Sequence, residues 1–496
     1  MKPLEVSNRM RVLFLFISCC IFSLELQSQS QTITLSEAIK VAQKESPDYQ
    51  AAVNRYQSGY WAYRRYKAGF LPGLRLDATL PNYSERVQRI LNDQGQDIFV
   101  NQNQAVTDLN LSLRQNVPFT GGVFSVQSRL DRVDIFGDNN STRYNIVPFS
   151  LNYFQNSLFY NPFRWDKKIE PLLYEESKRD FVEKMEDISL RTCRRYFGLL
   201  RAQIQLKIAE TNLANQDTLY KIAQNRFKIG KIAENELLQL ELSLLNAKNS
   251  KTNSEINLKQ TSQNLARFLR LETEDIELSI PEKLQDFDVS TQKALEEAQN
   301  NRKAVIEFRR RRLQAEKEVA RVKGTNRLQI NLNANFGISQ NGEEFDQLFG
   351  NYLRQQSVSL RLGVPIFDWG VSKAERKVAE ADLELTNTNI EQDQEAFEQE
   401  IYLHTLNWSN QRTFLATAQK AREVAAKRYD ISKARFILGK ITITDLNLAQ
   451  QEKDIAAVDY LESLEKFWVD YYTLRRLTLY DFIEKDKIQA EDLIFD

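Results

Sequence analysis

The most regular stretch of the chain alternates apolar and polar residues over eleven positions, Leu328 to Ile338. Alternation of this kind is typical of a β-strand with one side in an apolar environment and the other in water. Similar alternation covers residues 357–367, and the first half of the chain contains it within 74–81, 104–134 and 144–159. A tilted strand that crosses a bilayer needs about 9–11 residues. The pattern therefore predicts several strands of bilayer-crossing length.

Long charged segments with apolar residues at spacings of three and four fill most of the remaining chain, and this spacing is typical of helices packed lengthwise. Pro171 is suited to a first helical turn, and we expect a helix that starts there to continue without a breaker to Gly230. A second uninterrupted segment runs over 372–438. Average globular helices have only about 11–12 residues. We therefore predict two coiled-coil helical hairpins, at about 168–270 and about 371–480.

Two similar segments, Arg226 to Leu237 and Arg435 to Leu446, lie 209 residues apart and share an Arg-Phe pair, a Gly-Lys-Ile run, an acidic residue and a leucine. A glycine in this position ends a helix, so each segment predicts the turn at the tip of a helical hairpin. The chain is therefore expected to contain two structural repeats. The first spans 31–280, and the second spans 281–496 and includes a C-terminal tail.

The first repeat is longer than the second in its strand region. Equivalent residues are 256 positions apart before this region and 209 after it, so the first repeat carries 47 additional residues. These residues contain two further alternating runs, 109–119 and 122–130, which predict an added hairpin. The sequence leaves open whether this hairpin adds strands to the main sheet or projects from it.

Residues 1–30 have the features of a secretory signal peptide: basic residues, a short apolar run and small residues at Ser28 and Ser30. We expect export and cleavage after Ser30. An uncleaved anchor and a lipid attachment at Cys19 are the alternatives. Cleavage after Ser30 would leave Cys193 as the only cysteine, so no intrachain disulfide is expected.

The composition argues against several functional classes. The 67 basic and 67 acidic residues balance, whereas a nucleic-acid binder carries a basic excess. The single histidine, His404, and Cys193 have no metal-ligand partners at a usable spacing, and no phosphate loop, dinucleotide motif or nucleophile elbow occurs. We therefore expect no catalytic residues, no metal, no cofactor and no nucleic acid, and we predict that the protein is not an enzyme.

The predicted strands cannot form a closed membrane barrel within one chain. They number four, or six with the added hairpin, whereas membrane barrels begin at about eight strands because open edges in lipid leave backbone groups unpaired. Several copies must therefore combine. Aromatic residues follow the strands and could lie at the membrane interface or pack in an ordinary core; they are Phe159, Tyr160, Phe163, Trp165, Phe367 and Trp369.

These features together resemble the TolC family of outer-membrane efflux proteins. The resemblance rests on TLSEAIKVAQ near the start, the strand after KAGFLPGLRL, the VPIFDWG passage and the two tip segments, which recur in order. It implies an α+β membrane protein: a homotrimer with a transmembrane β-barrel of 12 strands, continued by a long α-helical coiled-coil barrel through the periplasm. The implied partners are outer-membrane lipid, a periplasmic adaptor and an inner-membrane transporter.

The resemblance also suggests roles for the tip residues. Asp445 matches an acid that forms a ring at the pore gate, and Glu236 matches an acid of the latch that holds the tips together. The tyrosine and arginine partners of that latch fall on Phe436 and Ile441, so the latch is incomplete, and Lys440 is the available replacement. Both acids could also serve only to solvate a turn and a helix start. The expected tip turns and adaptor contacts are Arg226, Gly230, Lys231, Arg435 and Gly439.

The resulting prediction is a passive outer-membrane exit duct, gated at its helical tips, for an efflux or a type I secretion system. The alternative is a periplasmic adaptor or structural coiled-coil protein without a pore. Adaptors usually contain one helical hairpin and compact β domains, whereas this sequence predicts two hairpins and bilayer-length strands. The sequence does not identify the transported substrate.

Overall fold

The computed structural model describes residues 32–137, 140–283, 287–326 and 328–489, so the predicted signal peptide lies outside the described residues. The chain divides into two compact units. The first takes its described residues from Met1–Ala52, Glu183–Ala294 and Tyr402–Ile488, and the second from Val53–Val182, Leu295–Ile401 and Gln489. Each unit thus combines parts of both predicted repeats, and each is described separately below.

The helices are α2 (Leu35–Glu45), α3 (Pro47–Ala68), α4 (Pro162–Lys228), α5 (Glu234–Leu269), α6 (Thr291–Asn301), α7 (Lys303–Thr325), α8 (Val371–Ile437) and α9 (Ile443–Thr478), with a 3₁₀ turn η1 (Asp346–Leu348). The strands are β1 (Thr32–Ile33), β2 (Gly73–Leu91), β3 (Asp97–Val117), β4 (Gly122–Phe136), β5 (Ser141–Gln155), β6 (Glu277–Leu278), β7 (Gln329–Gly342), β8 (Leu353–Gly363), β9 (Tyr480–Asp481) and β10 (Asp486–Lys487).

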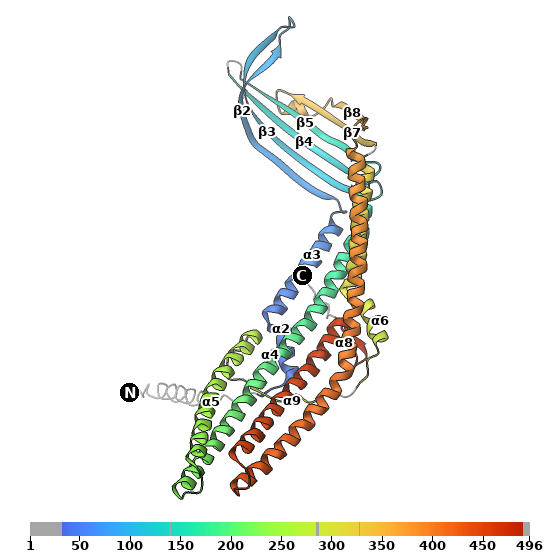
Figure 1. The fold of residues 1–496 in the computed structure, drawn as a ribbon. Coiled ribbons are helices and arrows are strands. Elements are labelled where there is room, and N and C mark those ends of the chain that lie inside the picture. The colour runs from blue at the N-terminus through green and yellow to red at the C-terminus, as the bar shows by residue number, and fades with distance from the viewer. Residues whose placement is uncertain (1–31, 138–139, 284–286, 327, 490–496) are drawn as a thin grey trace, which may run out of the picture. The chain divides into compact units, whose positions relative to one another are not determined.

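The second unit contains one six-stranded sheet with the order β2-β3-β4-β5-β7-β8 (Figure 1). Every neighbouring pair is antiparallel, so the sheet is a meander in which β5 of the first repeat pairs with β7 of the second. The two strands predicted for the added hairpin form part of β3 and β4 and lie inside this sheet. Strands β2 and β8 form its two edges, and neither pairs with the other.

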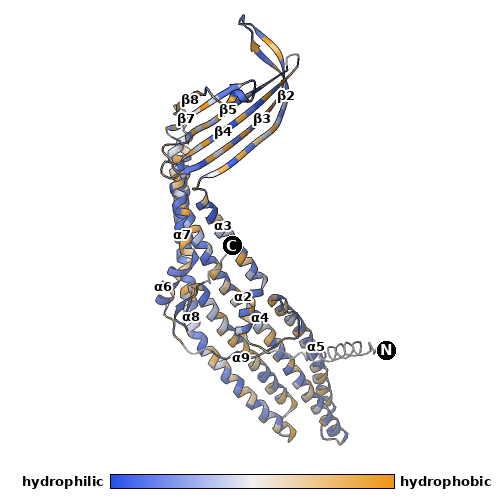
Figure 2. Ribbon diagram, turned by 180° about the vertical axis from the view of Figure 1, so that it is seen from behind, coloured by the Kyte–Doolittle hydropathy of each residue, from blue (hydrophilic) through white to orange (hydrophobic). Residues whose placement is uncertain are grey.

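The two faces of the sheet differ in polarity, as the alternating colours along its strands in Figure 2 indicate. Directly paired residues share a face, so the register assigns each side chain to one side. One face carries Leu74, Leu76, Leu109, Leu111, Leu113, Val126, Leu151, Leu332, Phe336, Val358, Leu360 and Leu362. The other carries Arg75, Asp77, Asn110, Ser112, Arg114, Ser125, Gln127, Ser150, Asn152, Asn335, Ser357, Ser359 and Arg361.

Both faces are open in the single chain. On the apolar face, Leu76 is 65% and Val358 77% exposed, although such side chains are normally buried. On the polar face, most of the polar residues of β2, β3 and β4 surround a hollow of about 750 Å³. The sheet therefore has one face suited to an apolar environment and one suited to water.

Several boundaries differ from those expected from the sequence. Strand β5 ends at Gln155 instead of 159, and β8 covers Leu353–Gly363 instead of 357–367. Strand β2 extends to Leu91, well beyond the predicted 74–81, and pairs with β3 as far as Asp97. Helix α4 begins at Pro162, so Pro171 lies inside the helix instead of starting it. The earlier start has a local cause, because the Asn161 side chain accepts a hydrogen bond from the backbone N–H of Arg164 at 3.2 Å and caps the first turn.

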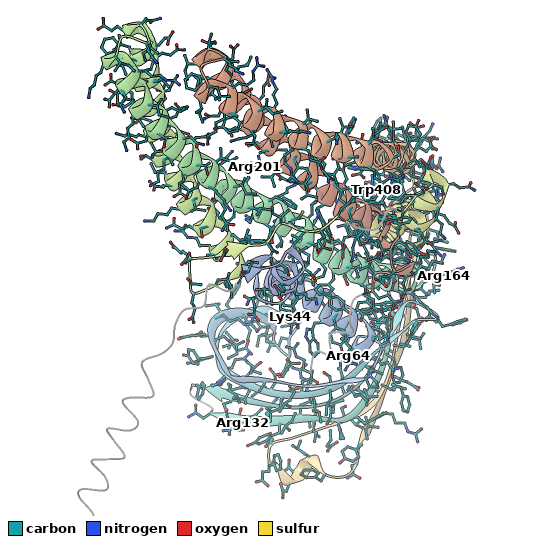
Figure 3. The ribbon with its side chains drawn as sticks, turned by 90° about the horizontal axis from the view of Figure 1, so that it is seen from below. Lys44, Arg64, Arg132, Arg164, Arg201 and Trp408 are labelled. Atoms are coloured by element: carbon teal, nitrogen blue, oxygen red, sulfur yellow. The ribbon has the colours of Figure 1, made fainter. Side chains whose placement is uncertain are left out.

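A continuous apolar core holds the first unit together. Most of its buried residues come from α2, α4, α5, α8 and α9, and Trp408 of α8, labelled in Figure 3, is one of the largest. The two-residue strands β1 and β6 pair in parallel, and the Tyr196 hydroxyl donates to the carbonyl oxygens of Ile33 and Ser279 at 2.9 and 2.6 Å. Arg201, also labelled in Figure 3, joins α4 to Glu462 and Glu465 of α9.

A buried charged cluster fixes α9 to α4 and to the end of the chain. The Arg475 guanidinium binds both carboxylate oxygens of Glu186, at 2.9 and 3.0 Å, and also contacts Asp481. The Glu186 side chain is only 2% exposed. A charge so far from water is tolerated only with a partner, so this pair couples the two helices strongly.

Arg475→Met is expected to destabilise the protein by about 3–5 kcal/mol, because it leaves the Glu186 carboxylate buried without its bidentate partner. The control is Arg476→Met at the adjacent, more exposed arginine, whose pairing with Asp187 at 3.4 Å should contribute less than about 1 kcal/mol. Urea unfolding followed by tryptophan fluorescence measures both. Equal midpoints for the two variants would contradict this assignment.

Candidate functional site: the paired helical tips

The two helical hairpins of the first unit end in turns of the same geometry. Gly230 and Gly439 have positive φ angles of 69° and 72°, which glycine adopts without the strain that a side chain would cause. In the first turn, Gly230 N–H donates to Phe227 and Lys231 N–H to Arg226; in the second, the equivalent residues form the same two bonds. Both turns are therefore Schellman motifs, which close helices at a left-handed glycine.

The two tips pack against each other. Leu219, Ala223 and Leu240 of the first hairpin form one buried cluster with Tyr429, Ile443 and Leu446 of the second, and Phe436 and Ile441 pack against it. The tips also surround a cavity of about 480 Å³. Its lining includes seven of the tip residues that the sequence singled out: Arg226, Lys231, Glu236, Phe436, Gly439, Lys440 and Asp445. Gly230 and Arg435 do not line it.

Arg226 connects the first tip directly to the second. Its Nη2 donates to the backbone carbonyl oxygen of Ile437 at 2.9 Å, and its guanidinium lies over the Phe436 ring at 5.9 Å from the centroid. Such cation–π contacts contribute about 0.5–1 kcal/mol at exposed sites. No sequence pattern indicates this connection, because its acceptor is a backbone carbonyl and any residue could stand at position 437.

The Asp445 carboxylate takes part in capping α9. Thr442 is the N-cap residue: its hydroxyl accepts from the Asp445 backbone N–H at 3.2 Å, while Asp445 Oδ2 accepts from the Thr442 hydroxyl at 2.7 Å and from its N–H at 3.1 Å. These bonds from the Thr442 side chain and backbone lower the pKa of Asp445. The exposed carboxylate therefore stays ionised at neutral pH. The Thr-x-x-Asp spacing is a known capping signal, so this cap could have been predicted from the sequence.

Glu236 occupies the equivalent position of the first tip but lacks the equivalent cap. Ala233 stands where the second tip has Thr442, and it makes no side-chain capping bond at the start of α5. Within the described part of the chain, no ion pair joins Glu236 to Lys231 or Lys440, although all three line the same cavity. Both duplicated acids line the cavity between the tips, but only Asp445 is part of a helix cap.

Residues 293–477 match the family model for outer membrane efflux proteins, which covers most of the second repeat. Among solved structures, the outer-membrane channel OprN is 15% identical with a TM-score of 0.66, covering 90% of this chain and 89% of its own. The Campylobacter jejuni outer membrane channel CmeC is 15% identical with a TM-score of 0.65, and the match covers 90% of this chain and 85% of CmeC. The open Neisseria gonorrhoeae channel MtrE is 15% identical with a TM-score of 0.60, and the match covers 92% of this chain and 91% of MtrE. No curated protein matches the sequence.

The resemblance to the TolC family of outer-membrane efflux proteins is confirmed. The family match lies in the second repeat alone, whereas the likeness in fold to outer-membrane channels covers nine-tenths of the chain. The first repeat therefore joins the second in one outer-membrane-channel fold.

The aromatic residues of the second unit have unequal surroundings. Phe367 and Trp369 are 71% and 88% exposed and contact each other edge to face at 4.5 Å between centroids. Phe159 is also exposed, whereas Tyr160 packs beside Gly324 and Trp165 lies under the Lys168 ammonium. Phe163 contacts Phe70 of the segment after α3. Phe159, Phe367 and Trp369 thus expose their rings, while the others pack locally.

Within the described residues, no helix combines the length and the apolar content needed to cross a membrane. No cluster of three or more histidine, cysteine, aspartate and glutamate side chains in the same ranges has an arrangement that could hold a metal ion.

The capping difference between the tips predicts opposite effects of two substitutions. Thr442→Ala removes a cap worth about 1 kcal/mol and should speed hydrogen exchange at the start of α9 about fivefold. Ala233→Thr creates a Thr-x-x-Glu capping box with Glu236 and should slow exchange at the start of α5. Hydrogen–deuterium exchange with mass spectrometry measures both. Equal exchange at both helix starts in the wild type, and no change in either variant, would contradict the difference.

Proposed function

We propose that this protein is an outer-membrane exit duct that works as a homotrimer. Three sheets close into a transmembrane β-barrel, and the helical hairpins of the three copies continue it as a coiled-coil barrel through the periplasm. The duct is a passive conduit, exported by a cleavable signal peptide and gated at its periplasmic tips. The membership of residues 293–477 in the efflux-protein family and the efflux-channel fold support this function.

The observation that carries the proposal is the two-faced sheet. Its apolar face is exposed on strands long enough to cross a bilayer, and its other face is lined with polar and charged groups. In a membrane barrel, outward residues contact lipid and inward residues contact a water-filled lumen. The apolar face therefore suits outer-membrane lipid, and the face with Arg75 and Asn110 suits a hydrated path. The exposed rings of Phe159, Phe367 and Trp369 suit the interface between lipid and periplasm.

The gate lies at the tips in this proposal. Three Asp445 carboxylates around a narrow axis would attract cations and repel one another, and the Thr442 cap favours their ionised form. Arg226 replaces the incomplete latch: its bond to the Ile437 carbonyl and its contact with Phe436 hold the tips of one chain together. Glu236 and Lys440 face the same cavity and can form an ion pair when the tips move.

The tips also provide the surface for the partners of the duct. Arg226, Gly230, Lys231, Arg435 and Gly439 form the two turns, at the far end of the hairpins. We infer that a periplasmic adaptor, coupled to an inner-membrane transporter, docks at these turns and separates the tips. An efflux pump and a type I secretion transporter both fit this arrangement, since each delivers its substrate to the entrance of the duct.

Membrane fractionation and heat-dependent gel migration test the proposed location. The wild type should fractionate with the outer membrane and migrate as a heat-sensitive trimer. Leu111→Arg on the apolar face should reduce membrane assembly, because an arginine at mid-bilayer costs about 2–4 kcal/mol. Ser112→Arg, on the opposite face of the same strand, should assemble normally. A soluble monomeric wild type, or equal assembly of the two variants, would contradict the proposal.

Asp445→Ala should lower the cation preference of the channel and weaken its block by multivalent cations, because it removes three carboxylates from the gate. Thr442→Ala is the matched control, since it disturbs the start of α9 but keeps the charge. Planar-bilayer conductance at neutral pH measures both properties. Unchanged selectivity and block in Asp445→Ala would exclude Asp445 from the pore.

Arg226→Met should raise the fraction of time that single channels stay open, because it removes the hydrogen bond and the charge that connect the tips while retaining an apolar stem. Arg226→Lys should have an intermediate effect, since one ammonium cannot bind the carbonyl and stack on the ring as a planar guanidinium does. An open fraction equal to that of the wild type in Arg226→Met would show that the latch lies elsewhere.

A further inference from the structure

The unequal length of the two repeats affects the wall of the duct itself. Strands β3 and β4, which contain the added hairpin of the first repeat, pair with each other from Val117 with Gly122 to Asn103 with Phe136. They also pair with β2 on one side and with β5 on the other. The additional strands are therefore central members of the sheet, and the chain contributes six strands to one continuous surface.

These central strands have the same division of faces as the rest of the sheet. Leu111 and Leu113 lie on the apolar face beside Leu76 and Leu74, and Ser112 lies on the polar face between Arg75 and Gln127. A hairpin that projected into water would not need its apolar residues on the same face as those of the neighbouring strands. The turn between β3 and β4 is also fixed in place: the Asn161 side chain donates to the carbonyl oxygens of Pro118 and Phe119, at 2.8 and 3.1 Å.

The two edges of the sheet are suited to each other. With six antiparallel strands, β2 and β8 run in opposite directions, so β8 of one copy can continue the antiparallel pattern beside β2 of the next. The faces match as well, because Leu74 and Leu76 on β2 and Leu360 and Leu362 on β8 belong to the apolar side. Matching faces requires a register in which even-numbered residues oppose even-numbered residues, since a slip of one residue would reverse every side chain.

The sheet already has the stagger that closure requires. The register links Gly73, at the start of β2, through one partner in each successive strand to Ser357 of β8. These partners are Arg114, Ser125, Asn152 and Asn335. Strand β8 continues six residues further, to Gly363. If the next copy's Gly73 meets this end, six strands shift by six residues. With about 3.3 Å per residue and 4.8 Å between strands, the strand tilt is about 35°, and a shift of eight residues gives about 42°. Both values lie in the range of about 35–45° found in barrels.

We propose that β8 of each copy pairs with β2 of the next, so that the wall of the duct has 18 strands, six from each of three copies. This inference rests on the trimer of the proposed function and goes beyond it, because it assigns the partner of each sheet edge and the size of the barrel. The partner of each edge is a second copy of this chain.

An 18-stranded wall makes the membrane part of the duct wide. At the spacing and tilt above, the backbone diameter is about 35 Å, against about 23 Å for 12 strands. Even after inward side chains are subtracted, such an opening does not sieve small molecules by size. Restriction of passage is therefore expected at the tips and not at the outer membrane.

Cysteine cross-linking tests the edge pairing on the full-length protein purified from membranes. Asp77→Cys combined with Ser359→Cys corresponds to the six-residue shift, and Asp77→Cys with Arg361→Cys to the eight-residue shift. One of these pairs should give a covalent ladder that ends at the trimer. Asp77→Cys with Leu360→Cys is the control, because its cysteines lie on opposite faces and should not link. The native Cys193 is fully buried and adds no background.

A second set of pairs within one chain tests the number of strands. Arg75→Cys with Ser112→Cys, and Ser125→Cys with Asn152→Cys, should each link because the residues are direct neighbours. Arg75→Cys with Asn152→Cys should not, since β3 and β4 separate them. If Arg75→Cys links with Asn152→Cys and the two neighbouring pairs do not link, the hairpin projects from the sheet. The 18-stranded wall would then be wrong, but the proposed trimer would not be affected. A ladder that ends at the dimer, or native mass measurements without a trimer, would contradict the proposed function itself.

Discussion

The arrangement of the sheet depends on one requirement: backbone N–H and C=O groups in a bilayer must be paired, because lipid offers them no hydrogen bonds. The single chain meets this requirement within its sheet but not at β2 and β8, whose outer edges are open. The exposed leucines on one face of the same sheet suit it to contact with lipid. In the proposed duct, other copies of the chain supply the missing pairing, and the six-stranded meander is one segment of a closed wall.

Because the chain contains two repeats, it has two sets of strands and two helical tips, and the members of each pair differ. In the sheet, the first repeat contributes four strands and the second two. At the tips, the two glycine turns are the same, but Thr442 caps the helix that contains Asp445, while Ala233 leaves Glu236 without a cap. The resulting difference gives the tips separate roles in the proposed gate. The connection between them runs through Arg226, in a chain where Phe436 and Ile441 replace the polar partners expected from the resemblance.

Sequence patterns could predict the features that depend on local residue order. Alternation identified the bilayer-length parts of the strands, and the glycines of RFKIGK and RFILGK identified the turns. The distal part of β2, beyond residue 81, lacks regular alternation, so no sequence pattern predicted its pairing with β3. Pro171 suggested a helix start, but the Asn161 cap, which depends on a side chain outside the helix, starts α4 earlier. The contact of Arg226 with a backbone carbonyl and the central position of the added hairpin depend on tertiary structure, which a single sequence does not encode in its periodicity.

A cysteine scan of β3 distinguishes a sheet with one lipid face and one water face from a sheet without this division. Single cysteines from Leu109 to Arg114 in protein reconstituted into liposomes would be treated with a water-soluble, membrane-impermeant thiol reagent. Labelling should alternate with every residue: fast at Asn110, Ser112 and Arg114, and slow at Leu109, Leu111 and Leu113. Uniform labelling along the strand, or alternation of the opposite sense, would contradict this division of the faces.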